Sequence, residues 1–474
     1  MEQYQRLRER FPRFYYRGYE ASVQEGCLEV TYRFETEGLA VFEPQWRFPI
    51  QKGEKDWLRD GLLREMLFSL GMAELVSYWK LTCSPRVIVE AGDLDEEQTR
   101  WWKKLYFNGL GEFFHVNGIE EADPEGFMAL ESTGVSSLSK EGSAGAAKNH
   151  EPALSGGFLV PVGGGKDSAV TLDLLLGAGF PVYGYIINPR GATLNTAARA
   201  GLGDRVMKAS RTLDKRMLEL NKEGYLNGHT PFSAVVAFSG LIGARLLGLP
   251  YIALSNESSA NESTVPGSRI NHQYSKSFEF ERDFHQYAAR YLPGSAYYFS
   301  LLRPLSEFQI ARYFAGLTQY HDIFRSCNSG SKTDSWCGSC PKCLFVYLIL
   351  SPFLSRKAVT DIFGRDMLED STMKENLEKL VGIAREKPFE CVGSRDEINT
   401  ALMLTINQIE AGKEPLPFLL SYYKNSGLYF KYRDRGDRYS SYFDDENLLP
   451  GQLLSLVREK CVQGIQPCTE EKEP

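Results

Sequence analysis

The feature that most constrains this chain is a short apolar run that leads through three glycines into a Lys-Asp-Ser sequence. Residues 158–162 are Phe-Leu-Val-Pro-Val, residues 163–165 are glycines, and Lys166, Asp167 and Ser168 open an apolar segment. This pattern predicts a buried strand, a tight turn and a helix. Glycines let the backbone approach a ligand closely, and the N–H groups at a helix start favour an anion. Lys166 adds a positive charge, Ser168 a hydroxyl and Asp167 a carboxylate suited to Mg²⁺. We therefore expect ATP chemistry at this loop.

The register of the loop excludes the two commonest phosphate-binding motifs. The Walker motif requires Gly-Lys-Ser/Thr, whereas Asp167 follows Lys166 here. The dinucleotide fingerprint requires spaced glycines, and Gly163, Gly164 and Gly165 are contiguous. The segment instead resembles the PP-loop of the ATP pyrophosphatase superfamily, Ser-Gly-Gly-x-Asp-Ser, with Gly163 in the place of the usual Ser. The alternative is a glycine turn without a ligand, which would have no need for Lys-Asp-Ser at the helix start.

Strands and helices alternate after residue 158. We expect further strands at 181–188, 205–209, 250–255 and 297–302, with helices at 234–247 and 307–315. This order predicts an α/β fold with a doubly wound parallel sheet. Ligands of such sheets bind at the carboxyl ends of strands, beside a topological switch point. Residues 163–168 and 256–261 would both lie there and face one ATP.

The chain divides into four predicted regions. Residues 1–132 mix strand and helix patterns and predict an N-terminal α+β domain. Residues 133–157 are rich in Ser, Gly, Ala and Lys, which predicts a flexible linker. Residues 158–350 would form the ATP-binding domain. Residues 351–474 are expected to be mainly helical, with a disordered charged tail.

Net charge and hydropathy weigh against two classes of protein, those that bind nucleic acids and those that span membranes. The net charge is −7 and the sequence pI is about 5.6, which weighs against a nucleic acid as the main partner. We find no apolar run approaching the roughly 18 residues of a membrane helix and no signal-peptide core at the start. We therefore expect a cytoplasmic protein without a membrane partner.

Four of the nine cysteines form a cluster. Cys327, Cys337, Cys340 and Cys343 supply the four thiolates of a closed zinc shell, so a structural Zn²⁺ site is the favoured interpretation. A thiol-catalytic role and an iron–sulfur cluster are the alternatives. The remaining thiols are expected to be ordinary small apolar residues. They are Cys27, Cys83, Cys391, Cys461 and Cys468.

A glycine loop followed by a four-cysteine cluster resembles the 7-cyano-7-deazaguanine synthase branch of the PP-loop superfamily. Further segments resemble a second family more closely, the UDP-N-acetylmuramoyl-L-alanyl-L-glutamate epimerases (MurL). The resemblance runs from about residue 25 to beyond 430. Besides 163–168, the segments that carry it are 77–80, 83–85, 101–102, 109–114, 255–261, 272–277 and 336–343.

The MurL resemblance implies that the terminal L-Glu of UDP-MurNAc-L-Ala-L-Glu is converted to D-Glu, with ATP and Mg²⁺ consumed and AMP formed, for peptidoglycan synthesis. Under this hypothesis the glycines, Lys166 and Ser168 hold the pyrophosphate, and Asp167 holds Mg²⁺. The remaining predicted site residues would contact either ATP with its Mg²⁺ or the dipeptide substrate. Glu257 and Asn261 would complete the metal or phosphate shell, Arg190 and Lys276 would reach phosphate or substrate carboxylates, and His272 would be either a proton-transferring base or a structural histidine.

Two other functions share the same loop. One is a different adenylating enzyme, a ligase or nitrile-forming synthase that combines a carboxylate with ammonia. The other is a tRNA-modifying protein that uses the loop and a zinc knuckle on RNA, against which the acidic charge argues.

Overall fold

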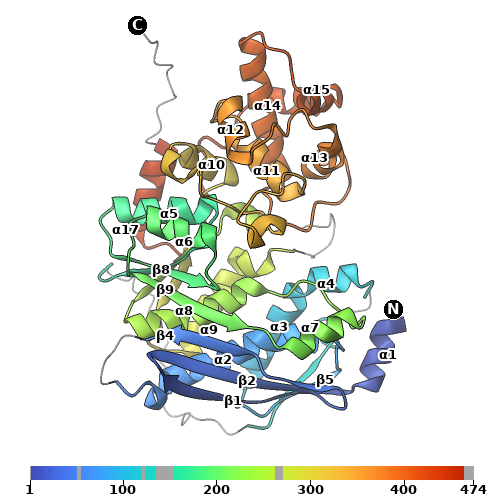
Figure 1. The fold of residues 1–474 in the computed structure, drawn as a ribbon, viewed down its shortest axis with the longest axis vertical. Helices are drawn as coiled ribbons and strands as arrows, with labels where there is room; N and C mark the ends of the chain where they lie inside the picture. Colours follow the sequence, from blue (N-terminus) through green and yellow to red (C-terminus); the bar gives the residue numbers. More distant parts are fainter. Residues whose placement is uncertain (1, 51–54, 120–122, 135–153, 262–270, 464–474) are drawn as a thin grey trace.

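The expected strand after the linker, β7 (Phe158–Pro161), is a central strand of the sheet in a computed structural model of the chain (Figure 1). The structure describes residues 2–50, 55–119, 123–134, 154–261 and 271–463. The predicted linker at 133–157 and the predicted C-terminal tail lie largely or wholly outside the described residues.

Five parallel strands form the half of the sheet that carries the glycine loop. Their order is β11-β10-β7-β8-β9, and every neighbouring pair is parallel. From β7 the chain moves first to one side, through β8 and β9, and then to the other, through β10 and β11. This reversal beside β7 is the topological switch point at which such sheets bind ligands. The strands are β8 (Val182–Ile187), β9 (Val206–Thr212), β10 (Tyr251–Leu254) and β11 (Tyr297–Ser300).

The N-terminal strands continue the same sheet. β4 (Gln45–Pro49) pairs antiparallel with β9, and the order runs on through β2, β1, β5 and β6. The strands from the predicted 1–132 and 158–350 regions are therefore hydrogen-bonded into one sheet, while the four-region division itself stays a prediction. The remaining strands are β1 (Arg13–Gln24), β2 (Cys27–Thr36), β3 (Ala40–Phe42), β5 (Arg86–Val89) and β6 (Ala129–Ser132).

Helices cover both faces of the sheet. On one face, α2 (Gly61–Trp79) packs on the N-terminal strands and against α8 (Phe232–Leu247), which packs on β7 and β10. On the other, α5 (Lys166–Gly177) packs on β7, β8 and β10 and against α10 (Glu307–Ala315). Most of the C-terminal helices lie at the end of the molecule opposite the N-terminal strands (Figure 1). The remaining helices are α1 (Glu2–Arg10), α3 (Glu96–Gly109), α4 (Gly111–Val116), α6 (Gly191–Arg199), α7 (Lys215–Lys222), α9 (Phe278–Tyr291), α11 (Pro341–Leu350), α12 (Arg356–Phe363), α13 (Lys374–Val381), α14 (Arg395–Ala411), α15 (Phe418–Asn425), α16 (Leu428–Arg435) and α17 (Gly451–Arg458).

Alternate residues of β7 enter two separate hydrophobic cores. Leu159 belongs to the core shared with α2, α8 and the N-terminal strands. Phe158 and Val160 belong to the core shared with α5, α10 and the C-terminal helices. Successive side chains of a strand point to opposite faces, so a continuous apolar run is what a strand covered on both faces requires. The expected α/β class with a large central sheet is confirmed. The sheet as a whole is mixed: the expected parallel order holds from β7 to β11, whereas β4, β2 and β1 pair antiparallel.

A buried polar junction fixes the seam between the two parts of the sheet. Arg211 on β9 donates two hydrogen bonds of 2.6 Å to the carboxylate of Glu74 on α2, and Trp46 on β4 donates one of 2.8 Å to the same group. Glu74 is fully buried. A buried carboxylate of this kind requires its cation and donors, so the junction ties α2, β4 and β9 together.

Candidate active site

The glycine loop lies between β7 and α5, at the carboxyl end of the central strand. Gly164 has φ of +81°, and a Cβ there would lie 2.9 Å from backbone atoms of Ala192 and Thr193. At Gly163, by contrast, a Cβ would meet nothing within 4 Å. Gly165 is the N-cap of α5 and makes no side-chain hydrogen bond to the first N–H groups of the helix. Ser168 is buried and its hydroxyl donates to the Gly165 carbonyl at 3.1 Å.

Buried charges surround the first turn of α5. The Lys166 ammonium donates to both Asp167 and Glu307, and Glu307 is the first residue of α10. Burial lowers the pKa of Lys166, but the two carboxylates outweigh burial and raise it above its usual range. Burial raises the pKa of Glu307 to about 8, with Asp167 and Glu257 contributing in the same direction against Lys166. Asp167 and Glu307 thus share Lys166, and Glu257 adds a further negative charge to the surroundings of Glu307.

The residues of this charge cluster come from three strand ends. Asp167 follows β7, Glu257 follows β10 and Glu307 follows β11. Parallel strands bring their carboxyl ends to one edge, which explains why residues so far apart in sequence share one charge environment. Glu307 was not predicted, because it stands at the start of an ordinary amphipathic helix.

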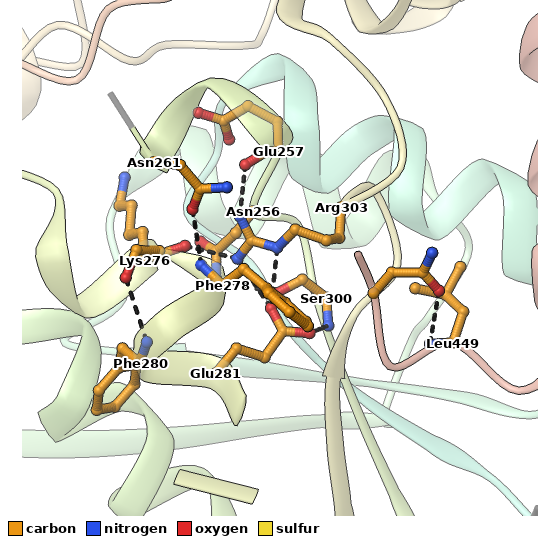
Figure 2. Close-up of polar contacts among 12 residues, drawn as sticks. Asn256, Glu257, Asn261, Lys276, Phe278, Phe280, Glu281, Ser300, Arg303 and Leu449 are labelled. Atoms are coloured by element: carbon orange, nitrogen blue, oxygen red, sulfur yellow. Dashed lines mark hydrogen bonds and ion pairs between the residues drawn. The ribbon is translucent and has the colours of Figure 1, made fainter. Parts of the chain in front are cut away.

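A fully buried arginine organises the loop after β10. Figure 2 shows Arg303 at the centre of these contacts: its guanidinium donates at 2.6 Å to the carbonyls of Glu257 and Lys276, and at 2.8 Å to the carboxylate of Glu281 on α9. Its exposure is 0%. Arg303 therefore sets the backbone positions of two predicted site residues without itself facing the glycine loop.

Two of the predicted site residues lie close to a thiol that was not predicted to belong to the site. The Lys276 ammonium lies 3.2 Å from the sulfur of Cys391, and His272 forms a side-chain hydrogen bond with the same thiol. His272 Nδ1 in turn contacts the carboxylate of Glu112. The prediction that Cys391 is an ordinary small apolar residue is wrong, because two cationic side chains face its sulfur.

Neighbouring charges favour the thiolate form of Cys391 and the protonated form of His272. Burial opposes the Cys391 thiolate, but Lys276, His272 and Lys342 together lower the thiol pKa to about 6. Burial lowers the pKa of His272, whereas Cys391 and Glu112 raise it, to about 9. At neutral pH the arrangement is therefore a thiolate beside an imidazolium and an ammonium.

The thiol and the glycine loop belong to one electrostatic environment. The charge of Cys391 is the largest influence that raises the pKa of Lys276, and Glu257 and Asp167 act on Lys276 as well. Glu397, at the start of α14, accepts hydrogen bonds of 2.7 Å from the backbone N–H groups of both Ser394 and Glu307. This shared carboxylate holds the start of α14, and with it the segment that carries Cys391, against the start of α10.

The four clustered cysteines converge as the metal-site interpretation requires. Sulfur–sulfur distances are 3.9 Å for Cys327–Cys340, 3.7 Å for Cys337–Cys343 and 3.5 Å for Cys340–Cys343. A tetrahedral zinc with bonds of about 2.3 Å places its sulfurs about 3.8 Å apart. Backbone N–H groups of Gly330 and Cys343 donate to two of the sulfurs. The cluster could hold a metal ion such as zinc.

The cysteine loop also supports both parts of the candidate site. Arg325, two residues before Cys327, donates its N–H to the Gly164 carbonyl at 2.8 Å. Asp334 accepts from the N–H of Ala192 at the start of α6 at 2.6 Å. Lys342, between two of the cysteines, donates to the Cys391 carbonyl. The cluster thus lies between the glycine loop and the segment of Cys391.

Two predicted residues contribute differently from the rest. Arg190 is exposed at the start of α6, where its backbone exchanges hydrogen bonds with the Thr193 hydroxyl. The Asn261 side chain accepts from the Phe278 N–H at 2.8 Å (Figure 2) and lines a surface cavity of about 920 Å³. Their roles toward phosphate stay predictions. The aromatic residues Tyr78, Trp79 and Trp102 are fully buried in the core shared with α2 and α8.

Comparisons with known proteins match most of the described chain. A model of the MurL N-terminal domain matches residues 5–301, and a model of the MurL C-terminal domain matches residues 323–417. No solved structure matches. Among the described residues, no helix combines the length and apolar character needed to cross a membrane.

Curated relatives carry one name, UDP-N-acetyl-alpha-D-muramoyl-L-alanyl-L-glutamate epimerase. The protein of Xanthomonas oryzae pv. oryzae (strain MAFF 311018) is 36% identical over 71% of this chain and 73% of its own. The protein of Micromonospora sp. (strain ATCC 39149 / NRRL 15099 / SCC 1413) is 35% identical over 70% and 73%. That of Salinispora tropica is 39% identical over 52% and 55%.

Proposed function

Because the chain belongs to the MurL family, we propose that it epimerises the terminal L-Glu of UDP-MurNAc-L-Ala-L-Glu through an ATP-derived acyl-adenylate. AMP and pyrophosphate leave, and the product serves peptidoglycan synthesis. The observation that carries the ATP-dependent part is the glycine loop at the switch point, with its uncapped helix start and the Lys166 charge cluster. We infer membership of the PP-loop superfamily from the same loop.

The chemistry gives the adenylation step a purpose. The α-hydrogen of a carboxylate is hardly acidic, because its removal adds charge to an anion. Joining AMP to the carboxylate removes that charge and leaves a carbonyl that accepts the electron pair. A base can then take the α-proton, and an acid on the opposite face can return one. Hydrolysis of the mixed anhydride restores the carboxylate.

The residues near the loop fit this first step. Gly164 allows the backbone to approach phosphate oxygens, Lys166 neutralises them, and the first N–H groups of α5 point toward them. Asp167 and Glu257 offer the oxygen ligands that Mg²⁺ prefers. Burial is the largest cause of the raised pKa of Glu307, and the charges of Asp167 and Glu257 add to it. Mg²⁺ bound there would supply neutralisation of the phosphates during adenylation.

An isotope experiment tests the proposal. The protein is incubated with UDP-MurNAc-L-Ala-L-Glu, ATP and Mg²⁺ in ²H₂O, and mass spectrometry and chiral analysis follow the glutamyl residue. We expect D-Glu that carries deuterium at Cα, with AMP formed only when the dipeptide is present. AMP formation without α-exchange would contradict epimerisation and support a ligase-like enzyme instead. Asp167→Asn is the loop control and should abolish both signals.

We further propose that the four cysteines hold one structural Zn²⁺. Metal analysis of the purified protein should find about one zinc per chain. Cys340→Ser should lose the metal and, because Arg325 and Lys342 flank the cluster, should also lower ATP–pyrophosphate exchange. Cys27→Ser, on β2, is the matched control. A zinc-free protein with full stability and full exchange would contradict the structural role.

A further inference from the structure

Glu112, His272 and Cys391 form a continuous chain of carboxylate, imidazole and thiol. The Glu112 carboxylate contacts His272 Nδ1, and His272 hydrogen-bonds the Cys391 thiol. The side chains of Glu112 and His272 are only 16% and 11% exposed. In this order a carboxylate orients an imidazole and the imidazole activates a sulfur, which is the general logic of an activated thiol.

Three separate elements converge to build this chain. Glu112 lies on α4, His272 precedes the short 3₁₀ turn at Tyr274–Lys276, and Cys391 precedes α14. Lys276 adds an ammonium 3.2 Å from the sulfur, and Lys342 fixes the Cys391 backbone by donating to its carbonyl. A thiol used only for packing would have no need of two cations and a backbone anchor from another helix.

The position relative to the glycine loop indicates what the thiol acts on. Lys276 contacts the sulfur and also interacts electrostatically with Asp167 and Glu257. Lys276 thus links the thiol to the carboxylates of the glycine loop, so a carboxylate activated at the loop would share the charge environment of the sulfur.

We propose that Cys391 is a catalytic residue that transfers the α-proton on one face of the glutamyl carbon; this rests on the proposed epimerisation. In one direction the Cα–H bond breaks, the proton forms the S–H bond, and the carbon's electron pair moves into the activated carbonyl. A protonated acid on the opposite face gives its proton to Cα. Solvent then reprotonates that acid and takes the proton from the thiol.

The geometry favours the thiol over its neighbours for this role. Nδ1 of His272 contacts Glu112, and the imidazole also forms a hydrogen bond with the Cys391 thiol. Lys276 is held as an ammonium by the charge of Cys391 and by the carboxylates, so it has no free electron pair to accept a proton. We therefore assign both as positioning residues, which keep the sulfur charged and oriented.

Cys391→Ser tests the assignment. The L- and D-glutamyl dipeptides are each incubated with ATP and Mg²⁺ in ²H₂O, and ATP–pyrophosphate exchange is measured in parallel. We expect epimerisation to fall at least about 100-fold while ATP–pyrophosphate exchange persists. Deuterium incorporation should remain with one epimer as substrate and disappear with the other. Cys27→Ser should behave as the unaltered protein.

A second measurement uses the unaltered protein. Iodoacetamide should alkylate Cys391 and abolish α-exchange, and ATP with the dipeptide should protect it, as followed by peptide mass spectrometry. Near-normal epimerisation by Cys391→Ser would overturn the assignment. So would equal loss of exchange from both epimers together with ATP–pyrophosphate exchange, or a substrate thioester on Cys391. Absence of ATP–pyrophosphate exchange in the unaltered protein would instead contradict the proposed function.

Discussion

At the scale of single residues, the site depends on charges that are kept buried together. Lys166 lies among carboxylates, and Lys276 lies beside a thiolate. Lys166 is buried and Lys276 is half-buried, so water does not replace their partners. Such clusters are costly to bury and are typical of catalytic sites, where the pKa values must differ from those in water. Glu307 shows this difference from water, because burial raises its pKa to about 8.

The Cys391 thiol predicts a specific pH dependence. Its pKa lies at about 6, because Lys276, His272 and Lys342 outweigh burial, and Glu390 is its acidic neighbour in sequence. The thiolate is the proton acceptor, so α-hydrogen exchange should fall about tenfold per pH unit below pH 6. Lys276→Gln removes a cation and should move this acidic limb toward higher pH, nearer the ordinary thiol value of about 8.5.

The position of the limb is the informative measurement, because Lys276→Gln could also change substrate affinity. Lys104→Gln is the matched control, since its ammonium pairs with Glu279 and Asp283 on α9 rather than with the thiol. A limb that stays in place in Lys276→Gln would contradict the role of this lysine.

From the sequence alone, only those site residues could be predicted that lie within a recognisable motif. Lys166, Asp167 and Ser168 are predictable because they follow a strand and three glycines. His272 and Lys276 followed from the family resemblance. Cys391 stands in a segment without a motif. Glu112 lies in the MurL-like segment 109–114, but that segment does not indicate a role for it. Only tertiary contacts bring the two residues to His272.

At the scale of elements, the strand-turn-helix unit β7–α5 is the part most fully determined by local sequence. A continuous apolar run, a turn that needs positive φ and an apolar helix each have a direct physical cause. The N-terminal strands also follow from alternation, as in β2. Their pairing with β9 does not, because which strand edges meet depends on contacts between distant segments.

Two glycine substitutions separate backbone geometry from chemistry. Gly164→Ala would place a methyl 2.9 Å from backbone atoms of α6 and impose φ of +81° on a residue with a side chain; strain of about 1–3 kcal/mol follows. We expect lower thermal stability and loss of ATP–pyrophosphate exchange. Gly163→Ser has open space at Cβ and supplies the hydroxyl of the PP-loop pattern that this loop resembles, so we expect exchange to be retained or increased. Equal loss in both variants would contradict this interpretation.

At the scale of the whole molecule, one sheet carries both the N-terminal strands and the glycine loop. The Arg211–Glu74–Trp46 junction lies at the seam, and β7 contributes residues to both hydrophobic cores. The two halves should therefore lose their structure together rather than as independent domains.

Arg211→Ala tests this coupling. It leaves the Glu74 carboxylate buried without its cation, which should lower the free energy of unfolding by about 3–5 kcal/mol. Urea unfolding followed by tryptophan fluorescence and by circular dichroism should give coincident transitions at a lower midpoint. Arg216→Ala, which removes an exposed ion pair on α7, should leave the unfolding midpoint close to that of the unaltered protein. Separate transitions for the two signals would argue for independently stable halves.

The late position of Cys391 in the chain bears on how the protein is made. During synthesis, the strands around β7, the glycine loop and α5 emerge from the ribosome long before the segment that precedes α14. The nascent chain would thus contain the glycine loop before the proton-transferring thiol of Cys391 has been translated. Glu397 must then dock on the α10 start before the two are joined. A premature stop before residue 391 would leave a fragment that retains the glycine loop and lacks the means to invert its substrate.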